Sequence, residues 1–170
     1  MSVPQTHGAW ADQVPLSVIT AREKVEGNRW IEERWRVIGV IAGRAEDSEK
    51  IVRTVLRTGP DGEQYLWTGF VLRLRPYEAD SYYYNIIGQN PSLYVYCRPD
   101  DTGEPCPHTV TAEYIEAMSV SETGNMSFAV PMPPEVYRVI EDYVLEHYEP
   151  DEPKMKRKRD NKRGERLDDD

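Results

Sequence analysis

The sequence contains few of the residues that form disulfide frameworks and metal clusters, with two cysteines and three histidines among 170 residues. Two cysteines cannot form a disulfide framework, so nothing in the composition indicates secretion. The longest apolar stretch covers residues 37–43, whereas a membrane-spanning helix needs about 20 apolar residues. Residues 1–5 show no basic segment followed by an apolar one, so we expect no export signal. These absences favour a soluble cytoplasmic protein with no membrane span.

The sequence also lacks the short motifs of common enzyme classes. No Gly-x-Ser-x-Gly elbow, phosphate-binding glycine-rich loop or dinucleotide fingerprint occurs. A Ser–His or Cys–His pair stays open, but no spacing selects one. Adjacent acids such as Asp100-Asp101 lie in turns or charged connectors, where carboxylates more often serve solvation than catalysis. We therefore predict a binding or assembly factor with no catalytic residues and no cofactor, rather than an enzyme.

Acidic residues outnumber basic ones by 30 to 21, which gives a formal charge of −9 and argues against nucleic acid as a partner of the body. The charge is unevenly divided. Residues 154–170 hold eight basic and five acidic residues, a net charge of +3, which leaves −12 for residues 1–153. We expect a disordered basic and then acidic tail over 151–170. This tail can fold back on the body, bind an acidic partner or touch a polyanion. Its predicted partner-binding residues are Lys156, Arg157, Lys158 and Arg159.

Periodicity predicts most of the strands, over residues 14–20, 35–41, 51–58, 64–75, 93–98 and 126–130. The segment 35–41 is apolar on both alternating sides, which favours a strand buried on both faces. The turn formers of 59–62 predict a hairpin between 51–58 and 64–75. In 64–75 we expect one face to be the core face, formed by Leu66, Thr68, Phe70, Leu72 and Leu74.

Helical periodicity predicts a helix over 79–87, ended by Gly88 in the left-handed conformation. Residues 100–107 read as a loop, and Thr111 can cap a short helix over 112–118. Pro134 can start a last helix that runs to about residue 148. The predicted fold class is α+β: a mainly antiparallel sheet with two or three short helices packed on it and a C-terminal helix. We expect one domain over 14–150, after a flexible N-terminus over 1–13.

Cys97, Cys106 and His108 are the one close set of soft metal ligands in the sequence. They are weak candidates for a metal site, because a structural zinc site needs a fourth ligand and their spacing matches no common zinc pattern. Cys97 lies in a predicted strand between tyrosines, where a thiol usually behaves as a small buried apolar group. A structural role is therefore the favoured interpretation.

Large rings are frequent, with 4 Trp, 11 Tyr and 2 Phe. Most belong to the core by their spacing. Trp67, however, lies opposite the expected core face of its strand, and Tyr84 lies off the apolar face of its helix. If either ring is exposed, it is a candidate anchor for a protein partner, because rings bury much area at little entropic cost.

Several segments together resemble one bacterial family. They are Trp30 through Trp35-Arg36-Val37 to Gly43, Leu72-x-Leu74-x-x-x-Glu78-x-x-x-Tyr82-x-x-Asn85, Pro91-Ser92-Leu93-Tyr94-Val95, Val110-Thr111-Ala112, Val130-Pro131-Met132-Pro133, Glu146-His147, Glu152-Pro153 and Lys156-Arg157-Lys158-Arg159. The family is a domain of unknown function encoded in bacterial formate dehydrogenase operons, and the resemblance spans about residues 14–160. Its operon neighbours include a ferredoxin-like iron–sulfur protein, a molybdoenzyme-class chaperone and the molybdenum-containing catalytic subunit.

The resemblance implies an accessory role in the maturation, assembly or regulation of a molybdenum-containing formate dehydrogenase. Its subunits or their maturation factors are the implied partners. Two alternatives stay open. One is a thiol-dependent redox or cofactor-handling protein that uses Cys97, Cys106 and His108, and the other is a small structural subunit of the mature enzyme complex. No catalytic residues are established for the family, so the resemblance assigns none.

Overall fold

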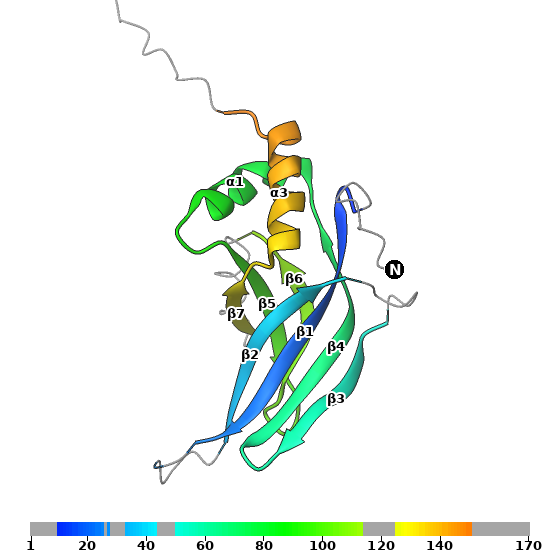
Figure 1. Ribbon diagram of the computed structural model, residues 1–170, viewed down its shortest axis with the longest axis vertical. Coiled ribbons are helices and arrows are strands. Elements are labelled where there is room, and N and C mark those ends of the chain that lie inside the picture. The colour runs from blue at the N-terminus through cyan, green and yellow to red at the C-terminus, as the bar shows by residue number, and fades with distance from the viewer. Residues whose placement is uncertain (1–9, 26, 28–32, 44–49, 114–124, 151–170) are drawn as a thin grey trace, which may run out of the picture.

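A computed structural model describes residues 10–25, 27, 33–43, 50–113 and 125–150 (Figure 1). These residues form two antiparallel sheets, one of four strands and one of three, together with two α-helices. The first sheet holds β1 (Gln13–Lys24), β2 (Glu33–Ala42), β3 (Val52–Gly59) and β4 (Gly62–Arg73). The second sheet holds β5 (Ser92–Pro99), β6 (Pro105–Thr111) and β7 (Met126–Pro131). The α+β class is confirmed, although strands dominate.

The first sheet has the strand order β2-β1-β4-β3, so the first strand of the chain lies in its interior. The predicted hairpin of β3 and β4 is confirmed, with Gly59 opposite Gly62 and two residues in the turn between them. Gly62 has a φ of +142°, and a Cβ atom there would lie 1.9 Å from the carbonyl oxygen of Arg22. Glycine is therefore required where the hairpin turn meets β1.

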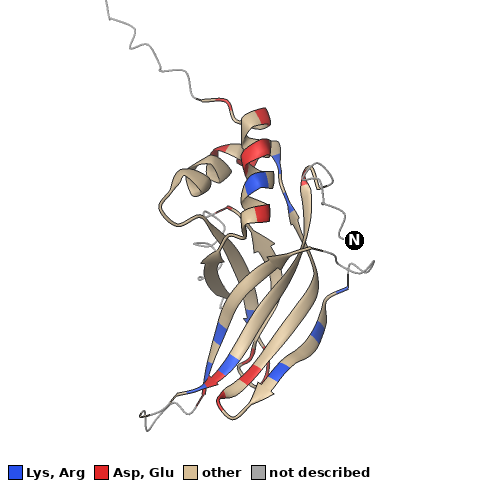
Figure 2. Ribbon diagram, viewed as in Figure 1, with Lys and Arg blue, Asp and Glu red and all other residues tan. Residues whose placement is uncertain are grey.

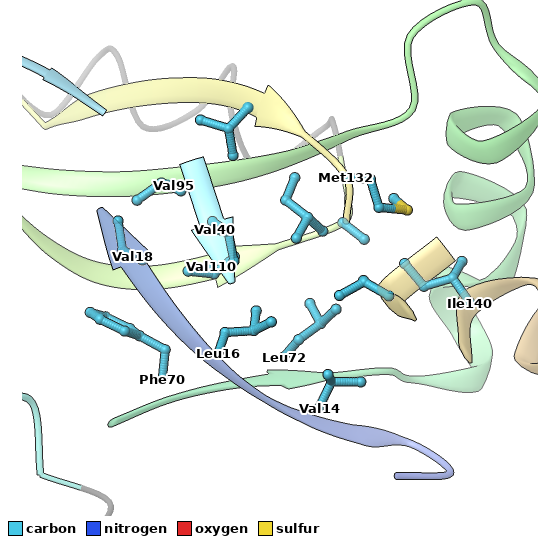
Figure 3. Packing of buried hydrophobic residues seen from close by; sticks show 14 of the residues in the cluster. Val14, Leu16, Val18, Val40, Phe70, Leu72, Val95, Val110, Met132 and Ile140 are labelled. Carbon is cyan, nitrogen blue, oxygen red and sulfur yellow. The ribbon is translucent and has the colours of Figure 1, made fainter. Parts of the chain in front are cut away.

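The second sheet, in the order β6-β5-β7, packs its apolar side against the first sheet. β6 lies against β4 and β7 against β2, which closes a sandwich with one core between the sheets. In Figure 3 the side chains of Leu16, Val18 and Val110 occupy the space between the strands. The helices were expected to pack on a sheet, and this part of the prediction is wrong, because the second sheet takes that place.

The helices instead lie beyond one end of the sandwich. A 3₁₀ turn, η2 (Pro76–Glu78), leads from β4 into α1 (Ala79–Ile87), which packs against α3 (Pro134–His147). Both helices were predicted from their periodicity. Ile140 of α3 belongs to the same buried cluster as Leu72 and lies at its helical end (Figure 3), so α3 closes the apolar interior at that end. Gly88 has φ −70° and ψ 172°, so the predicted left-handed stop is wrong.

The predicted core face of β4 is only half right, because a bulge changes the alternation. Leu16 of β1 lies opposite Phe70, yet Val18 lies opposite Trp67, so β4 has one extra residue between these pairs. Gly69, at this bulge, has a φ of +99°. After the bulge the expected residues Phe70, Leu72 and Leu74 are buried, but before it the buried residues are Tyr65 and Trp67.

β2 is not buried on both faces, because the second sheet covers only one side of the first sheet. Val37 and Val40 face the core, whereas Ile41 is exposed. The predicted loop over 100–107 is also too long, since β6 begins at Pro105 and pairs with β5. Most of the predicted helix over 112–118 lies outside the described residues, and Ala112 and Glu113 are not helical.

Candidate functional site

The first sheet has one side that no described helix or strand covers in Figure 1. We call this side the open face. The strand register places Ile19 opposite Leu66, Ser17 opposite Ile41 and Val52 opposite Thr68. Directly opposed residues share a side of a sheet. The open face thus carries Pro15, Ser17, Ile19, Ile41, Val52, Thr54, Leu66, Thr68 and Val71.

Aliphatic side chains are exposed at the margins of the open face. Ile41 of β2 is 51% exposed and Val52 of β3 is 45% exposed. They lie on opposite edges of the sheet, with half-buried Ile19 and Leu66 between them. A single exposed aliphatic residue is ordinary, but several on one side of a sheet form a surface suited to a protein partner.

The open face is surrounded by basic side chains. The strand register places four arginines on this side of the sheet. Arg34 lies opposite Glu23 and Arg36 opposite Ala21, while Arg57 lies opposite Gln64 and Arg73 opposite Gln13. Strands β1–β4 hold seven basic and three acidic residues, whereas the described residues of 76–150 hold two basic and eleven acidic ones. Figure 2 shows this division, with blue segments along the first sheet and mostly red ones on α3. The body is therefore polarised between a basic first sheet and an acidic remainder, which includes the acidic helix α3.

Trp67 does not lie on the open face. It is 7% exposed, and its Nε1 donates a hydrogen bond to Thr20 Oγ1 at 2.9 Å. The expectation that Trp67 lies opposite the core face is wrong, because the bulge at Gly69 turns this ring inward. A partner anchor needs an exposed ring, so Trp67 is not retained as one.

Tyr84 has the exposure that its predicted role requires. It lies on α1 with 65% of its surface exposed, next to Tyr83, whose ring is 5.4 Å away between centroids. Tyr83 stacks on Tyr148 at 4.3 Å and so holds α1 to the end of α3. Partner binding by Tyr84 stays a prediction. It concerns the acidic end of the molecule, away from the open face.

Cys97, Cys106 and His108 come together on the paired strands β5 and β6. Cys97 lies opposite Pro107, and Cys106 and His108 flank that proline. Cys97 is fully buried, and burial raises the pKa of its thiol to about 12. Cys106 is half-buried, its Sγ contacts the carbonyl oxygen of Glu104 at 3.6 Å, and burial raises the pKa of its thiol too. Both shifts disfavour the thiolate, which is the reactive and metal-binding form.

The structure describes no group of three or more His, Cys, Asp or Glu side chains arranged to hold a metal ion. Lys156, Arg157, Lys158 and Arg159 lie outside the described residues, so the binding role predicted for them stays a prediction. Within the described part of the chain, no helix is both long and apolar enough to span a membrane.

The open face could not be recognised as a site from the sequence. Its basic residues come from three strands spread between positions 34 and 73, and nothing local indicates that they share one side of a sheet. Comparison with known protein families identifies the family of this chain. The model of a family described as "Protein of unknown function (DUF3305)" matches residues 15–159. No curated protein matches, and no solved structure matches.

Proposed function

Since the chain belongs to the DUF3305 family, a family of unknown function, we propose a function from the surface that its fold presents. The protein is a non-catalytic accessory factor that binds another protein on the open face. The observation that carries this proposal is the coincidence of exposed aliphatic side chains and surrounding arginines on one uncovered side of a sheet. Apolar contact supplies affinity, and the arginines select the partner's charge.

The charge of the open face favours an acidic partner over a second copy of this chain. Two open faces in contact would bring arginines of β2, β3 and β4 toward arginines of the other copy, which is unfavourable at a desolvated interface. An acidic surface would instead pair with Arg34, Arg57 and Arg73, while its apolar residues contact Ile41 and Val52. We therefore assign the open face to a hetero-complex.

The resemblance identified in the sequence supports a finer proposal. The partner is a subunit or a maturation factor of a molybdenum-containing formate dehydrogenase, and binding serves its maturation, assembly or regulation in the cytoplasm. The basic residues 156–159 provide a second contact to the same acidic partner. Deletion of the gene should then lower formate dehydrogenase activity and its molybdenum content.

Complementation of the deletion strain tests the open face directly. The double variant Ile41→Glu, Val52→Glu places two carboxylates on the exposed margins and should fail to restore activity. The matched control is Leu145→Glu on α3, an exposed leucine far from the open face, which should complement like the wild type. Equal complementation by both variants would contradict the assigned surface, and unchanged enzyme activity in the deletion strain would refute the accessory role.

The same strain separates the alternatives. A Cys97→Ser, Cys106→Ser variant that complements fully supports a binding protein, whereas loss of activity with a folded variant supports thiol chemistry. A structural subunit would purify with the mature enzyme in stoichiometric amounts. An accessory factor should be found with the immature enzyme and be absent from the active one.

A further inference from the structure

A polar pocket of about 520 Å³ lies along the free edges of β4 and β6, where residues from both faces of β4 line it. It exists because β3 starts at Val52, opposite Thr68, so the residues of β4 beyond the bulge have no described strand on that side. β6 is likewise an edge strand. The pocket is lined by Gly69, Phe70, Val71 and Arg73 of β4 on one side and by residues 108–111 of β6 on the other.

Two arginines reach this pocket from the β4 side. Arg73 is exposed and has no ion pair among the described residues. Arg75 is oriented by Glu78, whose carboxylate lies 3.6 Å from Arg75 Nη1 and accepts a 2.5 Å hydrogen bond from the Tyr82 hydroxyl. Burial and Glu78 raise the pKa of Tyr82, so its hydroxyl remains a donor. The one acidic residue that lines the pocket is thus already bound to protein groups.

His108 and Thr109 line the pocket from β6. His108 Nδ1 lies 2.8 Å from Thr109 Oγ1, and His108 Nε2 is buried with no hydrogen-bond partner among the described residues. If the His108 Nδ1 carries the ring proton and donates it to Thr109 Oγ1, the Thr109 hydroxyl can donate its own proton to an acceptor in the pocket.

We propose that this pocket binds a phosphate monoester. Donors line both sides, with Arg73 and Arg75 on one and the Thr109 hydroxyl on the other. A tetrahedral phosphate presents acceptor oxygens in all these directions, whereas a planar carboxylate is satisfied by a single arginine. The pocket also has apolar walls, formed by Ile51, Phe70, Val71 and Val110. These walls suit the organic part of an ester rather than inorganic phosphate alone.

Titration of the purified protein with phenyl phosphate, inorganic phosphate and phenol tests this site. Calorimetry should show binding that is tightest for phenyl phosphate, weaker for inorganic phosphate and absent for phenol. The ring resonances of His108 should move on addition of phenyl phosphate. Absence of phenyl phosphate binding would overturn the proposal, and binding of phenol equal to that of phenyl phosphate would show an apolar cleft instead of a phosphate site.

Matched variants locate the site. Arg73→Gln removes one exposed donor of the pocket and should weaken phenyl phosphate binding about tenfold, the scale of a charge-assisted hydrogen bond. Arg34→Gln removes the same charge from β2, outside the pocket, and should leave the affinity within about twofold of the wild type. Equal weakening by both variants would reduce the effect to general charge attraction and would overturn the site. These measurements use the isolated protein, so their outcome is independent of the accessory role proposed above.

Discussion

Arg53 of β3 and Glu104 before β6 join the two sheets through a two-pronged ion pair. Arg53 Nε lies 2.8 Å from Glu104 Oε1, and Arg53 Nη2 lies 3.2 Å from Glu104 Oε2. The guanidinium also lies over the Tyr65 ring, 3.8 Å from its centroid. An edge strand that points a charge inward is poorly suited to pair with foreign strands. The pair thus ties β3 to the second sheet and helps to protect that edge.

Glu104→Ala should destabilise the protein by about 1–3 kcal/mol, because it leaves the partly buried Arg53 guanidinium without its counter-ion. The matched control is Glu23→Ala, which breaks an exposed pair with Arg36 at a similar distance of 2.9 Å. It should cost less than about 1 kcal/mol. Urea unfolding of both variants measures the difference, and equal losses would show that burial does not strengthen the Arg53 pair.

Gly69→Ala should destabilise the sheet by about 2 kcal/mol or more, since φ is +99° and the new Cβ would lie 2.3 Å from the carbonyl oxygen of Lys50. Gly39→Ala provides the control, because no atom lies within 4 Å of its Cβ position. There the substitution should be neutral or raise the free energy of unfolding by up to about 1 kcal/mol. Denaturant titrations compare the two, and a tolerated Gly69→Ala would argue against the bulge.

Trp67→Ala should lower the free energy of unfolding by about 3–5 kcal/mol, because it removes a buried ring and leaves Thr20 without its hydrogen bond. Tyr84→Ala removes an exposed ring and should change the free energy of unfolding by less than about 0.5 kcal/mol. Thermal unfolding distinguishes the two positions. A stable Trp67→Ala protein would return Trp67 to the list of candidate anchors.

The two thiols should differ in reactivity toward an alkylating reagent. Cys106 is half-buried and should react first, whereas fully buried Cys97, with a pKa raised to about 12, should react only as the protein opens. Mass spectrometry of partly alkylated protein identifies the modified residue. In Cys106→Ser the early reaction should disappear, and rapid labelling of Cys97 in that variant would contradict its burial.

Stability should fall below neutral pH in part through His108. Burial, and to a smaller extent Arg98, lowers the pKa of this imidazole below its ordinary value of 6.5. The unfolded chain therefore binds the proton more readily, so the contribution is complete above about pH 6.5 and is lost as pH falls toward the lower folded pKa. His108→Gln should reduce the difference between unfolding free energies at about pH 7.5 and about pH 5.5 in a phosphate-free buffer. If His108→Gln leaves this difference in unfolding free energy unchanged, the loss of stability at low pH arises from other groups.

Local periodicity was sufficient for most elements of the fold. The turn of residues 59–62 and the helical spacing of 79–87 both arise from short-range geometry, and both were predicted correctly. The bulge at Gly69 depends on how β4 pairs with β1, which lies far away in the sequence. The edge position of β2 likewise depends on sheet order. Pro105 and Pro107 led to the prediction of a loop where β6 lies. The segment forms a strand because it pairs with β5.

The candidate site was less predictable than the fold. The exposure of Tyr84 was predicted correctly, because helical spacing alone decides which side of a helix a residue lies on. Trp67 was predicted on the wrong side of β4, because a bulge reverses which alternate residues face the core. The predicted charge contrast was between an acidic body and a basic tail. The structure adds a contrast within the body, because strand pairing gathers arginines that are distant in sequence.

The interior position of β1 has a consequence for the order in which the chain folds. Its main partner, β4, ends at Arg73, so β1 (Gln13–Lys24) cannot complete its pairing during synthesis until that part of the chain has left the ribosome. Until then β1 and β2 form a two-stranded ribbon, which is marginal in water. Contacts between segments so far apart in sequence slow folding, on the order of milliseconds to seconds for sandwiches. The nascent chain should therefore bind chaperones most strongly before β4 emerges.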